Sequence, residues 1–129
     1  MSATSQLRKW LPLLLRILVA AIVTLPAVGK FLDYGGQVEF FASLGIPAPE
    51  ILVLVVGTIE AVSVLMLLLG IAGRVAALAL VGVMLVAIIT AGVNPLNLTV
   101  LLASVGILYL GTGPYSLWEP EDRLWESTA

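Results

Sequence analysis

The sequence predicts an all-α integral membrane protein that forms a single domain, a bundle of four transmembrane helices. Of the 129 residues, 60% are hydrophobic and only 11% are charged, whereas a soluble domain has about 45–50% apolar and about 25% charged residues. The apolar residues are also gathered into four runs, each close to the length that crosses a bilayer. The lipid bilayer is therefore the first expected partner.

The first apolar run predicts a transmembrane helix over residues 10–31. This run is longer than the apolar core of a signal peptide, and Arg16 interrupts it, so we expect a helix that the mature protein retains. The connection after it is too polar to span, and Gly35-Gly36 indicates a turn. Its apolar side chains predict a short interfacial element between the first two spans, either a surface helix or an ordered loop.

The second and third spans are expected over residues 50–70 and 74–93, and the short link between them predicts an antiparallel hairpin. Asn94-Pro95 has the composition of a turn and helix cap, and it opens the fourth span over residues 96–111. Residues 112–129 are acidic and aromatic, which is typical of a tail at the interface or in water.

Four spans place both termini on the same side of the membrane. Most cationic residues then fall on that side: Arg8, Lys9, Arg74 and Arg123. The positive-inside rule therefore predicts an N-in/C-in topology with both termini cytoplasmic, and we expect the chain in the cell membrane of a prokaryote. Lys30, near the other side, lies three residues before Asp33, and this spacing predicts an ion pair between them.

Two charged residues lie deeper inside the predicted spans, where a charge usually faces the bundle interior and pairs. Arg16 lies six residues beyond Trp10, about 9 Å deep, and Glu60 lies ten residues before Gly70, about 15 Å deep. Two long side chains can close this difference in depth, so we expect an Arg16–Glu60 pair. The pair is interpreted either as a structural ion pair that fixes the register of two helices or as part of the lining of a polar ligand site.

Small and polar residues surround these charges. One face of the second span brings Gly57 and Ser63 beside Glu60. On the third span, a narrow stripe of small residues ends in Thr90 and Asn94. Close packing between helices is the competing interpretation of both faces.

Neither cysteine nor histidine occurs in the sequence. The chain therefore has no disulfide, no thiolate nucleophile and no ordinary ligand for haem, copper or an iron–sulfur cluster, and we expect no metal site. We do not expect it to be self-sufficient as an enzyme, and its catalytic residues stay unassigned. Any redox centre would be a bound organic molecule or would belong to a partner. No basic stripe is present, so no nucleic-acid partner is expected.

Several short motifs, in their order and spacing, make residues 10–117 resemble the DoxX family. Arg16 lies in an apolar first helix that ends in Gly29-Lys30-Phe31-Leu32-Asp33, and the connection contains Phe41-Ala42-Ser43-Leu44-Gly45-Ile46-Pro47. Gly57-Thr58-Ile59-Glu60 precedes a leucine-rich run, Gly73-Arg74 opens the third span, and Gly-Thr-Gly-Pro-Tyr-Ser-Leu follows the fourth. The chain departs from the family where many members carry histidine, at the end of the third span, and at Trp118, which replaces the usual acid.

The resemblance implies a small four-helix protein, a DoxX-like transmembrane domain over residues 1–129, whose polar positions are Arg16, Lys30, Glu60 and Arg74. It further implies a membrane subunit of an oxidoreductase or respiratory system, in which Arg16 and Glu60 bind a quinone-like lipid. Thr90 and Asn94 are then expected to donate hydrogen bonds to this ligand. Two alternatives stay open. The chain could be a non-catalytic structural or assembly subunit of a larger membrane complex, or a small proton-coupled transporter. Partner subunits or a homo-oligomer are expected in the subunit roles.

Overall fold

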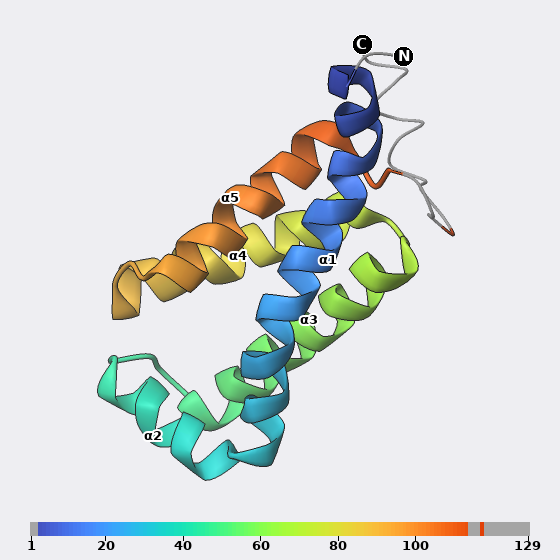
Figure 1. The fold of residues 1–129 in the computed structure, drawn as a ribbon. Coiled ribbons are helices and arrows are strands. Elements are labelled where there is room, and N and C mark those ends of the chain that lie inside the picture. The colour runs from blue at the N-terminus through green and yellow to red at the C-terminus, as the bar shows by residue number, and fades with distance from the viewer. Residues whose placement is uncertain (1–2, 114–116, 118–129) are drawn as a thin grey trace.

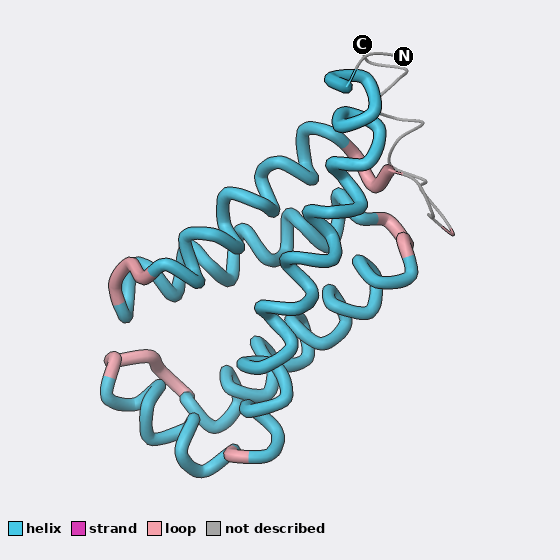
Figure 2. Tube along the Cα trace, viewed as in Figure 1, coloured by secondary structure: helices cyan, strands magenta, loops and turns pink. Residues whose placement is uncertain are grey.

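The computed structural model describes residues 3–113 and 117, and these residues are helical apart from short connections (Figures 1 and 2). The helices in chain order are α1 (Ala3–Leu32), α2 (Tyr34–Ser43), α3 (Pro49–Leu69), α4 (Gly73–Ala91) and α5 (Pro95–Leu110). The predicted all-α fold is confirmed, and each expected span coincides with one of the longer helices. Within the described part of the chain, α1, α3 and α4 are long and apolar enough to cross a membrane, and α5 is a shorter apolar helix of 16 residues.

The four longer helices pack side by side around one apolar core. α1 and α4 each lie between α3 and α5, so that each helix has two neighbours (Figure 1). The most deeply buried core side chains come from all four helices: Val19, Leu67, Ala77, Leu80 and Ile107. Leucine, isoleucine and valine side chains are widely exposed on the outward faces, which is typical of a surface that contacts lipid rather than water.

The ends of the helices follow from local sequence. Pro49 and Pro95 occupy first-turn positions, where the missing N–H would have had no helical partner. Gly70 ends α3 at φ 71°, in the left-handed region that glycine adopts without a steric cost. Asn94 and Asn97 cap α5 reciprocally, because each side-chain oxygen accepts a hydrogen bond from the other's backbone N–H at 2.9 Å. The cap predicted at Asn94-Pro95 is confirmed.

The connection between the first two spans contains a helix, α2, and is not only an ordered loop. This helix packs on α3 and α1 at the end of the bundle opposite to the start of α1 (Figure 1), and Phe41 is its buried side chain. The Tyr34 hydroxyl donates to the Glu50 carbonyl at 2.7 Å. This bond joins the start of α2 to the start of α3, close to the end of α1.

The start of α1 and the end of α5 lie at the same end of the bundle (Figure 1). Thr112, which opens the predicted tail, is fully buried there, so the tail begins inside the packed structure. Residues 114–116 and 118–129, which contain most of that tail together with Arg123, lie outside the described residues.

Candidate functional site

Three charged residues within the described part of the chain are buried: Arg16, Lys30 and Glu60, which are 1%, 7% and 2% exposed. Each belongs to a helix long and apolar enough to span a membrane. Charge at such depth is costly unless it is paired or hydrogen-bonded. The three residues meet this requirement in two separate places, one at each end of α1.

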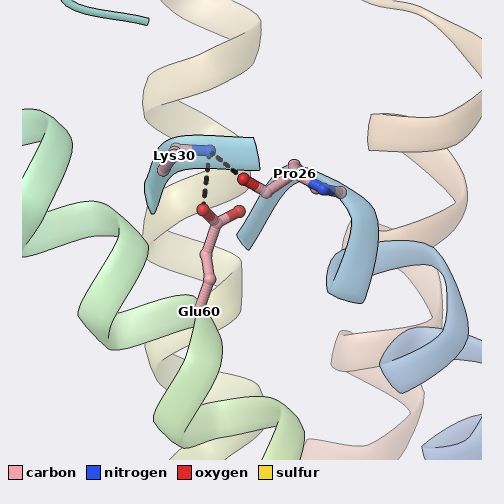
Figure 3. A network of polar contacts seen from close by, with 3 residues as sticks. All are labelled: Pro26, Lys30 and Glu60. Carbon is pink, nitrogen blue, oxygen red and sulfur yellow. Dashed lines mark hydrogen bonds and ion pairs between the residues drawn. The ribbon is translucent and has the colours of Figure 1, made fainter. Parts of the chain in front are cut away.

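The first place is an ion pair between Lys30, near the end of α1, and Glu60, in the middle of α3. Lys30 Nζ lies 2.7 Å from Glu60 Oε1, and both side chains are almost entirely hidden from solvent. The separation is that of an ion pair, although the carboxylate oxygen has no aligned hydrogen bond. Lys30 also donates to the Pro26 carbonyl at 3.4 Å, so its ammonium lies between that carbonyl and the carboxylate (Figure 3).

Gly57 allows this pair to form. A side chain at this position would start 3.1 Å from Lys30 Cβ and 3.3 Å from the ring of Phe31, which is tighter than ordinary van der Waals contact. The missing side chain therefore lets the end of α1 approach α3 closely. Lys30 is thus level with Gly57, three residues or about 4.5 Å along α3 from Glu60, and its long side chain covers that difference.

The second place is the opposite end of the bundle, where Arg16 binds backbone carbonyls. Its Nε donates to the Leu67 carbonyl at 2.8 Å, and its Nη1 donates to the Thr112 carbonyl at 3.0 Å. Leu67 belongs to the last turn of α3, whose carbonyls have no helical N–H to accept from and carry partial negative charge. The guanidinium therefore satisfies two backbone acceptors and joins α1 to the ends of α3 and α5.

Two neighbours complete this end of the bundle. The Thr112 hydroxyl accepts a hydrogen bond from Gly73 N at 3.0 Å, which caps the start of α4, and a side chain at Gly73 would start only 2.8 Å from that hydroxyl. Arg74 Nε donates to the Leu108 carbonyl at 3.0 Å, in the last turn of α5. The resemblance motifs around Arg16, Gly73-Arg74 and Thr112 thus converge on helix capping. This capping role was not predicted from the sequence.

Two predicted ion pairs are therefore wrong. Glu60 pairs with Lys30 and not with Arg16, because Arg16 is level with Leu67, seven residues or about 10 Å along α3 from Glu60. Lys30 does not pair with Asp33, because its ammonium points toward α3 while Asp33 is exposed at the start of α2. The first prediction did not allow for backbone carbonyls at a helix end as the partners of Arg16. The second did not allow for a carboxylate on another helix as the partner of Lys30.

Thr90 and Asn94 lie where α4 ends and α5 begins, and both use their side chains locally. The Thr90 hydroxyl donates to the Val86 carbonyl at 2.7 Å within its own helix. The Asn94 side-chain oxygen caps α5, and this residue is exposed. Among the described residues, neither side chain forms a hydrogen bond or an ion pair with Lys30 or Glu60.

A groove lies on the other side of α3, between α3 and α4. Its volume is about 260 Å³, and its lining is almost wholly apolar: Thr58, Ile59, Val62, Ser63, Met66, Val75, Ala76 and Ala79. Ser63 is 3% exposed and follows Glu60 by three residues. The prediction that Ser63 lies beside Glu60 on one face of α3 is confirmed. The groove that Ser63 also lines was not predicted from the sequence.

The Lys30–Glu60 pair has the chemistry of a polar site for a neutral ligand. An ammonium donates hydrogen bonds and a carboxylate accepts them, so together they can bind a carbonyl and a hydroxyl oxygen and exchange a proton with either. Arg16, by contrast, is committed to the carbonyls that it caps. The described residues contain no group of three or more acidic, histidine or cysteine side chains that could hold a metal ion.

The model of the DoxX family matches residues 11–93, well over half of the chain. The match covers most of α1 and all of α2, α3 and α4, and it therefore includes Arg16, Lys30, Glu60 and Arg74. No curated protein and no solved structure matches the chain.

Proposed function

The chain belongs to the DoxX family, which is associated with membrane and oxidoreductase-related roles, and from this premise we propose that it is a membrane subunit of an oxidoreductase system. Its proposed task is to bind a quinone-like lipid at the Lys30–Glu60 ion pair. The observation that carries this proposal is the pair itself, which is buried within helices of membrane-spanning composition. Ionisable residues at such depth are rare, and they commonly mark ligand and proton pathways.

The chemistry of a quinone suits this pair. Reduction of a quinone to a quinol consumes two electrons and two protons, so a binding protein must supply or pass on protons at the ring oxygens. The Lys30 ammonium can donate to a quinone carbonyl, and the Glu60 carboxylate can accept from a quinol hydroxyl. The sequence has no cysteine or histidine, so the electrons would come from a partner subunit, consistent with a subunit role.

Glu60→Gln is the variant that tests this function, because it keeps the size of the side chain and removes its charge and its exchangeable proton. We expect the purified variant to carry several-fold less extractable quinone than the wild type, and its membranes to lose quinol-linked electron transfer. Glu50→Gln, an exposed carboxylate at the start of the same helix, is the matched control and should leave both measurements unchanged.

No extractable quinone in the wild-type protein, together with unchanged quinol-linked activity in Glu60→Gln, would contradict the proposal. A variant that loses thermal stability or complex yield while retaining its quinone would instead support a structural or assembly subunit. These two results are distinguishable because quinone content is measured per molecule of folded protein.

We further propose that α5 is a fourth span and that both termini are cytoplasmic, in the cell membrane of a prokaryote. At about 24 Å, α5 is shorter than the roughly 30 Å hydrocarbon core, and the local thinning or tilting that a short span requires costs little. The distribution of Arg8, Lys9 and Arg74 favours this orientation. Reporter fusions at residue 129 should be active only with a cytoplasmic reporter. Activity of a periplasmic reporter there would contradict the topology.

A further inference from the structure

The α3–α4 groove is separate from the Lys30–Glu60 pair and opens on the outward surface of two helices of membrane-spanning length. Val62 and Val75 on its rim are about half exposed, and its floor contains the small residues Ala76 and Ala79. In a bilayer, this surface contacts lipid. A chain or ring that fills an apolar groove of about 260 Å³ gains van der Waals contacts with its walls, so the groove favours an occupant that fits its shape.

Ser63 gives this groove its one buried hydrogen-bonding group. Three threonine hydroxyls on the apolar helices are satisfied by their own backbone, since Thr24, Thr90 and Thr99 each donate to the carbonyl four residues earlier. Among the described residues, the buried hydroxyl of Ser104 on α5 has no hydrogen-bond partner either, but Ser104 does not line the groove. Ser63, although 3% exposed, makes no such bond and has no other hydrogen-bond partner in the part of the chain that is described. A buried hydroxyl without a partner is costly, and the groove that it lines is where a partner could bind.

We propose that the α3–α4 groove binds a neutral lipid through its chain and through a carbonyl oxygen that accepts a hydrogen bond from Ser63. The size of the groove favours a chain or single ring over a protein helix. One turn of helix, about 10 Å across and 5.4 Å long, occupies about 400 Å³, more than the groove offers. A chain segment or one ring fits, and the rest of the lipid stays in the bilayer.

Depth and charge exclude a charged headgroup. Ser63 lies six residues before the end of α3, about 9 Å along the helix, and fourteen residues after its start, about 21 Å. A phosphate or carboxylate drawn to that depth would lose its hydration with no cation in the groove lining to compensate. A carbonyl oxygen is neutral, and one hydroxyl satisfies it. The occupant therefore differs from the phospholipids whose charged groups stay at the interface.

Two probes of equal chain length test this site, a decyl-substituted benzoquinone and decylbenzene, which lacks the carbonyl oxygens. Native mass spectrometry of the full chain in one detergent would measure the dissociation constant of each. We expect the wild type to prefer the carbonyl probe by about two- to tenfold, the equivalent of one neutral hydrogen bond. In the Glu60→Gln background, which removes the proposed ion-pair site, Ser63→Ala should abolish this preference. The substitution deletes a single oxygen, so the fold is retained.

Two further variants separate the groove from the rest of the surface. Ala79→Leu fills the groove and should weaken binding of both probes about tenfold or more, whereas Ala21→Leu, on an exposed position of α1, should bind both as the wild type does. The inference is overturned if Ser63→Ala keeps the preference in the Glu60→Gln background, or if Ala79→Leu binds normally. It is also overturned if Ala79→Leu changes the oligomeric mass, because the groove would then be a protein interface.

Glu60→Gln distinguishes this site from the proposed quinone site. Binding in the groove predicts that Glu60→Gln keeps a twofold to tenfold preference and that the double variant Ser63→Ala/Glu60→Gln loses it. If the preference disappears in Glu60→Gln and persists in Ser63→Ala, the ring binds at the ion pair. That result would overturn the groove site while supporting the proposed function.

Discussion

Arg16→Met is expected to lower the free energy of unfolding by about 3–5 kcal/mol, because two helix ends lose their hydrogen-bond donor. Each hydrogen bond to a charged group contributes about 1.5–3 kcal/mol, and Arg16 donates one to Leu67 and one to Thr112. Methionine fills a similar length without replacing either bond. The buried carbonyls are then left without the partner that a helix end requires.

Removal of the guanidinium also removes the free-energy cost of burying its charge, and this gain offsets part of the lost stability. We expect the loss to remain large, because carbonyls at helix C-termini are the acceptors for which a cation is most favourable. Arg16→Lys should recover part of the stability, since a single ammonium keeps the charge but lacks the fork that reaches two separate carbonyls.

Unfolding in a titration of denaturing detergent, followed by circular dichroism, would measure these differences. Arg8→Met is the matched control, because Arg8 is an exposed arginine on the same helix, and it should change stability by less than about 0.5 kcal/mol. Equal unfolding curves for Arg16→Met and Arg8→Met would mean that the capping bonds contribute nothing.

The fold could be predicted from sequence because each of its determinants is local. Apolar runs mark the spans, while Gly70 and Asn94-Pro95 mark helix ends, and the structure places helix boundaries within a few residues of the expected ones, except that α1 begins at Ala3 rather than near Trp10. The buried face of α3 was also predictable: Val53, Gly57, Glu60, Ser63, Val64 and Leu67 are all buried on it. A period of 3.6 residues suffices to identify such a face.

The partners of the charged side chains could not be predicted in this way. Pairing depends on how far two helices slide past each other, and a depth counted from Trp10 or Gly70 assumes straight helices with ends at equal height. Gly57 carried the missing signal, because a glycine one turn before Glu60 marks where another helix comes closest. A weaker indication in the sequence marks the role of Thr112, which lies between two glycines just beyond the end of a helix.

The Lys30–Glu60 pair gives the second large expected effect, and the effect is unequal for its two members. Lys30→Met leaves the Glu60 carboxylate buried and unpaired in the middle of α3 and should cost about 3–5 kcal/mol. Glu60→Leu should cost less, because Lys30 lies near the end of α1 and its long side chain can turn to the membrane surface. The same unfolding titration measures both.

The double variant Lys30→Met/Glu60→Leu decides between the two interpretations of the pair. Replacement of a buried ion pair by apolar side chains of similar volume is often neutral or stabilising, so we expect the double variant to regain most of the stability that Lys30→Met loses. A double variant no more stable than Lys30→Met would contradict the energetic coupling of the two charges.

Stability alone cannot explain why the chain keeps the pair if an apolar replacement is as stable. We therefore expect the double variant to fold as the wild type does and to contain no quinone above the level of Glu60→Gln. A stable fold without bound quinone would distinguish a ligand-binding role from a purely structural one. Apolar packing can replace a structural ion pair, but it cannot replace a binding site. A stable double variant that retains the wild-type quinone content would mean that Lys30 and Glu60 only hold α1 against α3.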